Sequence, residues 1–328
     1  MRCTVDKFRS QAVRAKRLTK PVYIVYGDEP FFIADAVDVL REVFRREAGP
    51  EAAVETFVAE EVSLASVLDD LRTEDFFQTR RLVVLTAAGE VMKSSADVLL
   101  RYLESPGSSS TLVLTSDKLP GSRKLVGAID EAGVIVECKG LYENKLPQWL
   151  IARAKDDGYQ LAPRAAARLV ELVGTDLFKL ASELSKVYLY AGERTKLTSD
   201  DVHAVVAPSR EYVGYELTEA LLGRDTQRTM RIADKLLEER EAAYMILVVV
   251  GRSLRRLWRM SRDPRLGPGE IGMHPYAFKK LKVHARRFRE DDFRRANRLL
   301  VDTDRALKTT GMDARVAIEG LLTTLMAM

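Results

Sequence analysis

Residues 21–31 read Pro-Val-Tyr-Ile-Val-Tyr-Gly-Asp-Glu-Pro-Phe, and this stretch decides the fold class. Its β-branched and aromatic run over Val22–Tyr26 predicts a buried strand that ends at Gly27. A helix with one apolar face is expected directly behind the turn, marked by Ile33, Val37, Leu40 and Phe44. A buried strand, a short turn and a helix in succession are typical of a parallel sheet covered by helices.

The same alternation of strand and helix continues through the first 140 residues. Further strands are predicted over residues 54–58, 82–86, 111–115 and 134–137, where β-branched runs recur between turn residues. Leu64, Val67, Leu68 and Leu71 mark the next helix. We therefore expect an α/β domain over residues 1–140 with an open, parallel, five-stranded sheet.

Beyond Gly140 the strand patterns stop and the apolar residues follow helical spacing. We expect a small all-α domain over residues 141–210, in which Thr198 caps a short helix. The chain is predicted to enter a second all-α domain near Pro208. That domain covers residues 211–328, and its helices are expected to break at Pro264, at Pro268 and before Pro275.

The composition is that of an ordinary globular protein, with 46% hydrophobic and 30% charged residues among 328. Its longest apolar run, Met245–Val250, is far shorter than the roughly 20 residues that span a membrane, so no membrane segment is expected. The basic N-terminus has no apolar core of the signal-peptide kind. With Cys3 and Cys138 as its only cysteines, the chain is expected to be cytoplasmic and to lack a disulfide framework.

The net charge of +4 is unevenly distributed along the chain. From Tyr212 onward there are 23 Lys/Arg and 16 Asp/Glu, a balance of +7, whereas the first 211 residues carry 29 and 32, a balance of −3. A basic excess of this kind is found on nucleic-acid-binding faces, and also on helices that are simply solvated. Both interpretations stay open on charge alone.

The turn at Gly27 occupies the position where nucleotide-binding sheets carry a phosphate-binding loop. A working loop of the pattern GxxxxGK[ST] needs a second glycine, a lysine for the phosphates and a hydroxyl for magnesium. Here Gly27 is followed by Asp28 and Glu29, whose charges repel a phosphate. The later strand over residues 82–86 also ends without the carboxylates that would hold magnesium. We expect no nucleotide cofactor.

Other catalytic chemistry has no recognisable residues to carry it. His203, His274 and His284 lie far apart in the sequence, and no GxSxG, HExxH or CxxC pattern occurs. We therefore expect a binding scaffold without catalytic residues or a metal site. Two alternatives stay open: an ATPase with a cryptic site, which would bind ATP with magnesium, and a stand-alone DNA-binding protein.

Residues 21–31 closely resemble the opening strand and turn of the delta subunits of DNA polymerase III. Further similarity extends over essentially the whole chain, at residues 173–177, 183–187, 197–202, 274–277 and 304–311. The resemblance implies an ATPase-like sheet domain that has lost its ATP site, a helical lid domain and a helical collar domain. It also implies partners: tau or gamma ATPase subunits, a delta-prime subunit, the beta sliding clamp, and primed DNA onto which the opened clamp is loaded in DNA replication.

In this family a hydrophobic pair just before the third strand enters a pocket on the clamp. Phe76 and Phe77 match that pair, within a polar segment that is typical of an exposed turn. The alternative is that one ring packs under the sheet while the other is partly exposed. The family often has Leu at the first position, so Phe76 departs from the commonest form, which bears on pocket fit.

A group of arginines in the third domain is the candidate for DNA contact. Arg252, Arg255, Arg256, Arg259 and Arg262 are spaced to crowd one side of a helix that also carries Trp258. They are expected either to contact phosphates of primed DNA or to form a solvated or subunit-contacting face.

Overall fold

The computed structural model describes residues 1–328 except 13–16, 50–51, 74–79, 239–241, 274 and 286. The chain forms two compact units, Met1–Lys145 with Lys155–Gly158, and Leu146–Ala154 with Tyr159–Met328. The expected lid and collar domains both fall almost entirely within the second unit, so their division near residue 210 stays a prediction.

A parallel sheet forms the centre of the first unit. Its described strands are β1 (Arg2–Thr4), β2 (Val22–Tyr26), β3 (Ala53–Val58), β4 (Arg81–Thr86), β5 (Ser110–Ser116) and β6 (Val134–Glu137). They are ordered β1-β6-β2-β5-β4-β3, and each neighbouring pair is parallel. Ile24 of β2 lies in register with Leu114 on one side and Ile135 on the other. The turn after β2 is thus at the centre of the carboxyl edge, where such sheets bind ligands.

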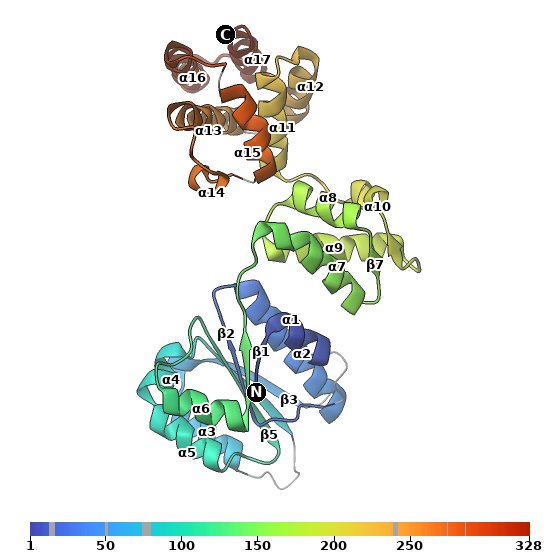
Figure 1. The fold of residues 1–328 in the computed structure, drawn as a ribbon, viewed down its shortest axis with the longest axis vertical. Helices are drawn as coiled ribbons and strands as arrows, with labels where there is room; N and C mark the ends of the chain where they lie inside the picture. Colours follow the sequence, from blue (N-terminus) through green and yellow to red (C-terminus); the bar gives the residue numbers. More distant parts are fainter. Residues whose placement is uncertain (13–16, 50–51, 74–79, 239–241, 274, 286) are drawn as a thin grey trace. The chain divides into compact units, whose positions relative to one another are not determined.

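Helices cover both faces of this sheet (Figure 1). One face carries α1 (Val5–Ala12) and α2 (Pro30–Ala48), and the other carries α3 (Leu64–Arg72), α4 (Gly89–Ser94), α5 (Ala96–Glu104) and α6 (Arg123–Ala132). Successive strand residues serve opposite faces. Tyr23 meets Phe8 of α1 edge to face at 6.4 Å, whereas Ile24 belongs to the core beneath α3 to α6 with Leu68 and Tyr102.

The predicted α/β class is confirmed, and so is the position of each predicted strand within one residue at either end. The predicted number of strands is wrong, because β1 adds a sixth at the edge beside β6. β1 has three residues, of which Cys3 alone is buried. Three residues cannot show an alternating pattern, so this strand depends on pairing with β6 rather than on local sequence.

The second unit begins with short helices and one small strand pair. Its first helices are α7 (Leu146–Asp156), α8 (Pro163–Val173), α9 (Leu177–Ala191) and α10 (Ser199–Val205). Thr198 is the N-cap residue of α10, as predicted, and its N–H and hydroxyl both donate to the Asp201 carboxylate. The expectation that strands end at Gly140 is wrong in one detail, because β7 (Gln160–Leu161) pairs in parallel with β8 (Lys196–Leu197). Two-residue strands carry no periodic signal.

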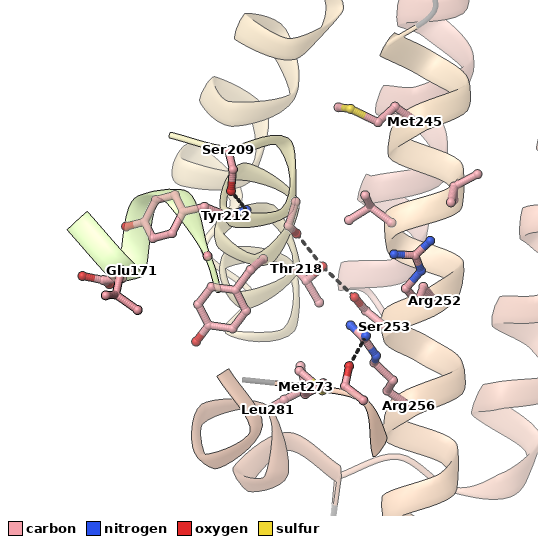
Figure 2. Close-up of a pocket in the computed structure, with 17 residues that line it drawn as sticks. Glu171, Ser209, Tyr212, Thr218, Met245, Arg252, Ser253, Arg256, Met273 and Leu281 are labelled. Carbon is pink, nitrogen blue, oxygen red and sulfur yellow. Dashed lines mark hydrogen bonds between the residues drawn. The ribbon is translucent and has the colours of Figure 1, made fainter. Parts of the chain in front are cut away.

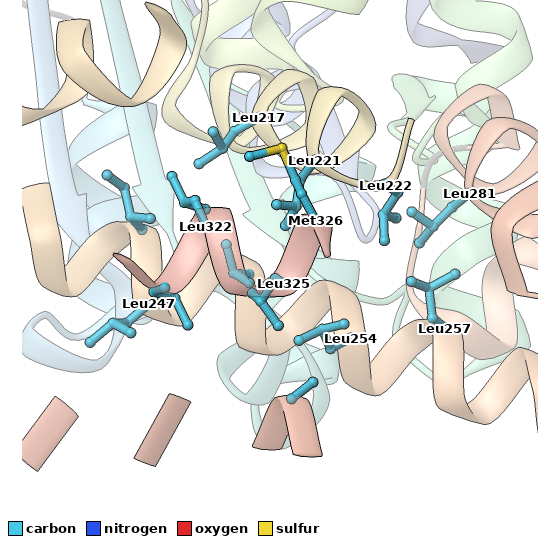
Figure 3. Close-up of a cluster of buried hydrophobic side chains, with 14 of the residues drawn as sticks. Leu217, Leu221, Leu222, Leu247, Leu254, Leu257, Leu281, Leu322, Leu325 and Met326 are labelled. Atoms are coloured by element: carbon cyan, nitrogen blue, oxygen red, sulfur yellow. The ribbon is translucent and has the colours of Figure 1, made fainter. Parts of the chain in front are cut away.

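Helices of the C-terminal part enclose one apolar core. They are α11 (Arg210–Leu222), α12 (Thr226–Leu237), α13 (Ala242–Arg262), α14 (Pro268–Ile271), α15 (Pro275–Ala285), α16 (Glu290–Thr309) and α17 (Ala314–Met326). Figure 3 shows Leu322 and Leu325 of α17 beside Leu254 of α13 and Leu221 of α11. The predicted breaks are confirmed, since α13 ends before Pro264 and the next two helices begin at prolines. Within the described part of the chain, no helix is long and apolar enough to cross a membrane.

Candidate functional site

The turn after β2 is closed by the neighbouring strand. An added Cβ at Gly27 would lie 1.9 Å from the carbonyl oxygen of Cys138, so only glycine fits at this close approach. The Gly27 N–H donates to the carbonyl of Ser116 at 3.1 Å, and the Cys138 N–H donates to that of Tyr26 at 2.7 Å. These bonds extend the pairing of β2 with β5 and β6 into the turn. The room that a phosphate-binding loop opens at this point is filled by backbone.

The chain's own carboxylates occupy the positive end of α2. The Glu29 side chain accepts a hydrogen bond from the Phe31 N–H at 3.1 Å, and Pro30 between them has no N–H to offer. The Glu29 N–H donates to the Cys138 carbonyl at 3.2 Å, while Asp28 accepts from the Gly140 N–H at 2.9 Å. A phosphate would have to displace a carboxylate to reach these amides. The geometry therefore adds a physical reason to the expectation of no nucleotide cofactor.

Capping by Glu29 was missed in the sequence analysis, which considered Asp28 and Glu29 only as repelling charges. A Glu-Pro pair ahead of an apolar-periodic run is a helix-start pattern, with the acid at the cap and proline at the first helical position. The sequence therefore contained the signal. It could not show that Asp28 would reach Gly140, because that contact spans 112 positions.

At the end of β4, hydroxyl and amide groups bond to the neighbouring strands. Thr86 donates its hydroxyl to the Phe57 carbonyl at 3.1 Å, and the Ala88 N–H donates to that of Thr115 at 2.7 Å. No group of three or more His, Cys, Asp or Glu residues suited to a metal is found in the portion that the structure describes. Burial raises the pKa of the Cys138 thiol to about 12, so this sulfur stays protonated near neutral pH and is a poor ligand or nucleophile.

Phe76 and Phe77 lie outside the described residues. The flanks of their segment are well fixed: α3 ends at Arg72 with the Thr73 N–H donating to the Asp69 carbonyl at 3.1 Å. On the other side Arg80 pairs with Glu47, and Arg81 pairs with Glu55 at 2.9 Å. The hydrogen bonds that Arg81 donates to the Glu55 carboxylate raise the pKa of its guanidinium. The segment thus leaves from and returns to positions held by the sheet domain.

The arginines named in the sequence analysis all lie on α13, but they have different surroundings. Arg256 donates a hydrogen bond to the Gly272 carbonyl, and Arg259 donates one to the Glu270 carbonyl at 3.0 Å. Both arginines therefore hold the end of α14. Arg262 lies 3.9 Å from Glu290 and stacks over Trp258. Arg252 and Arg255 are exposed and form no hydrogen bond or ion pair with the described residues.

A pocket of about 380 Å³ adjoins this helix (Figure 2). Arg252 and Arg256 lie on its α13 wall, where the Ser253 hydroxyl is 3.0 Å from that of Thr218. Tyr212 stands on the opposite wall, and its hydroxyl accepts from Arg168 at 3.0 Å. Among its described lining residues there is no histidine or cysteine, and the Ser209 hydroxyl accepts from the Tyr212 N–H at 3.2 Å. The pocket has no activated nucleophile and is suited to binding rather than catalysis.

Two family models match this chain. The model described as "DNA polymerase III, delta subunit" matches residues 23–139, and the model described as "DNA polymerase III delta subunit, C-terminal domain" matches residues 212–325. The first match includes the strand and turn at Gly27 and the segment with Phe76 and Phe77. The second includes the arginines of α13.

Individual relatives match over nearly the full length. DNA polymerase III subunit delta of Bacillus subtilis is 26% identical over 322 residues, which cover 93% of each chain. The subunit of the same name in Escherichia coli is 22% identical, over 92% of this chain and 90% of its own. The solved structure of the Bacillus subtilis DNA clamp loader delta protein superposes with a TM-score of 0.74 at 25% identity, covering 99% of this chain and 100% of that one.

Proposed function

The chain belongs to the family of DNA polymerase III delta subunits, and from that premise we propose that it binds the beta sliding clamp and opens it for loading onto primed DNA. The observation that carries the proposal is the full-length similarity to a clamp loader delta protein, which spans the sheet domain and both helical regions. In this role the chain would act as a non-catalytic subunit of an assembly rather than as an enzyme.

The proposed subunit acts without hydrolysing ATP itself. Glu29 and the Cys138 carbonyl fill the space that a nucleotide phosphate would need at the central turn. Energy for the cycle then has to come from partners, for which we propose tau or gamma ATPase subunits beside a delta-prime subunit. Hydrolysis in those neighbours would control when this chain reaches the clamp.

We propose Phe76 and Phe77 as the anchor that enters the clamp. Burying a Phe side chain contributes roughly 1.5–3 kcal/mol, so two rings can supply most of the free energy of a micromolar-class contact, about 8 kcal/mol, before ordering costs. Support comes from the fixed flanks, since ion pairs at Arg80 and Arg81 limit the freedom lost when the segment binds.

Opening follows if the anchor and its surroundings bind the open clamp more tightly than the closed one. A ligand shifts a conformational equilibrium only through such a difference in affinity, and it needs no chemical step of its own. The subunit would then stabilise the open ring while the ATPase subunits time its release.

Calorimetry of the purified chain with its cognate clamp tests the proposal. Wild type is expected to bind, and Phe76→Ala/Phe77→Ala is expected to weaken binding by at least about 100-fold, since two buried rings are lost. Tyr142→Ala is the matched control, because Tyr142 is an 82% exposed aromatic of the same unit. Unchanged affinity in the double variant would reject the anchor, and no binding by folded wild type would reject the clamp as partner.

Contact with primed DNA is proposed within the assembled loader. Of the five candidate arginines, Arg256 and Arg259 bond carbonyls at the end of α14. Arg262 lies 3.9 Å from Glu290, and Arg255 lines a separate groove. Arg252, which is exposed and makes no ion pair with the described residues, is therefore the arginine best suited to a phosphate.

A further inference from the structure

A groove of about 300 Å³ lies between α13 and α16. Its floor is apolar, with the buried side chains of Leu254 and Phe293, and Trp258 forms one wall with 43% of its surface exposed. Gly251 also lines the groove, and a Cβ added there would be 3.6 Å from Leu300 Cδ1. A glycine at this helical position leaves open the volume that a side chain would otherwise fill.

The rim of the groove carries a surplus of positive charge. Arg255 and Arg294 line it together with a single acid, Glu290. That carboxylate is already engaged, since Arg294 bonds it at 2.9 Å and Arg262 lies 3.9 Å away. Arg255 is exposed and forms no ion pair with the residues that the structure describes. The groove thus presents an apolar floor beside a cation without a counter-charge.

We infer that this groove binds an acidic peptide segment of a partner protein through one large apolar side chain. The apolar floor accepts the anchor, and Arg255 pairs with a neighbouring carboxylate. Asn297 at the wall provides an amide that both donates and accepts, as a peptide backbone requires.

A nucleic-acid strand fits this groove less well than a peptide. Arg262 already stacks over the Trp258 ring, 5.9 Å from its centroid, and so competes with a base for that ring. The floor is made of aliphatic and buried aromatic side chains rather than an open stacking platform. The inference goes beyond the proposed function, because it uses neither Phe76 and Phe77 nor a DNA contact.

The fluorescence emission of Trp258 provides a measure of binding in the groove. The chain has two tryptophans, and the other, Trp149, is only 8% exposed, so a change in emission on binding reports mainly on the groove. The full-length protein is titrated with a short Asp/Glu-rich peptide that carries one Phe. Saturable binding is expected, and it should weaken at least about tenfold when Phe is replaced by Ala or the acids by Lys.

Three variants make the test specific. Gly251→Leu fills the groove without changing charge and should weaken the peptide at least about tenfold, and so should Arg255→Glu/Arg294→Glu. Arg231→Glu/Lys235→Glu on exposed positions of α12 is the control with the same charge change, expected within about twofold of wild type.

Three outcomes would overturn the inference. The first is no saturable peptide binding by wild type that circular dichroism shows to be a folded helical protein. The second is peptide binding that Gly251→Leu leaves unchanged. The third is that Gly251→Leu excludes oligothymidylate rather than the peptide. The last would identify the groove as a nucleic-acid surface.

Discussion

Glu29 caps the helix that begins at the next residue by accepting a hydrogen bond from the Phe31 N–H at 3.1 Å. This bond places a carboxylate at the site where related sheets hold a nucleotide phosphate. Glu29 therefore both caps the N-terminus of α2 and occupies the position that a nucleotide phosphate would need.

Removing this cap is expected to destabilise the sheet domain. Glu29→Ala should lower the free energy of unfolding by about 1 kcal/mol, because the Phe31 N–H loses its acceptor and the helix end its negative charge. Urea unfolding measures the difference. Glu104→Ala, at an exposed glutamate at the end of α5, is the control and should stay within about 0.5 kcal/mol of wild type. Equal stabilities of Glu29→Ala and wild type would contradict the capping role.

The close approach of Gly27 to the Cys138 carbonyl predicts a larger loss of stability than removal of the Glu29 cap. Gly27→Ala places a methyl group 1.9 Å from the Cys138 carbonyl oxygen, so backbone must move, and a loss of at least about 2 kcal/mol is expected. Gly127→Ala in the exposed part of α6 meets nothing within 4 Å and should stabilise by about 0.5–1 kcal/mol. Thermal unfolding should thus move in opposite directions for the two changes. A Gly27→Ala protein as stable as wild type would show that the turn is not closed.

Stability is expected to depend on pH through Asp201. The hydrogen bond from Arg194, with those from the Thr198 amide and hydroxyl, holds the pKa of this carboxyl below its ordinary value. A lowered folded-state pKa contributes stability above the unfolded pKa of about 3.9, and this contribution is lost as the pH falls through the folded value. Wild type should therefore be more stable than Asp201→Asn at neutral pH, with the difference disappearing in acid.

Thermal melts of both proteins across that range provide the measurement. Asp200→Asn changes an exposed neighbour in the same helix turn and serves as the control, with no pH-dependent difference from wild type expected. A difference in thermal stability between wild type and Asp201→Asn that is the same at pH 7 and in strong acid would contradict the ion-pair explanation.

Arg252 is expected to contribute a salt-dependent part of DNA binding by the assembled loader. Arg252→Ala should weaken binding to primed duplex DNA and reduce the slope of log K against log salt by about 0.9, the value for one lost phosphate contact. Fluorescence anisotropy over a salt series measures it, with Arg231→Ala as the control. Weaker binding with an unchanged slope would mean that Arg252 acts through packing instead.

Local sequence was sufficient for the elements that depend on near neighbours. The run Val22–Tyr26, the periodic apolar face of α2 and the prolines that begin α14 and α15 each specify their structure within a few residues. The same holds for the Thr198 cap, because its partner Asp201 is three positions away. The missing lysine and hydroxyl after Gly27 could likewise be seen directly.

Tertiary structure decided the features that join distant positions. β1 exists through pairing with β6, and the turn at Gly27 is closed by Cys138 from more than a hundred residues away. The arginines of α13 have equivalent spacing in the sequence, yet α14 takes Arg256 and Arg259 while α16 forms a groove beside Arg255. Helical periodicity fixes which side of a helix a residue lies on, but the packing partner decides whether its charge is already paired.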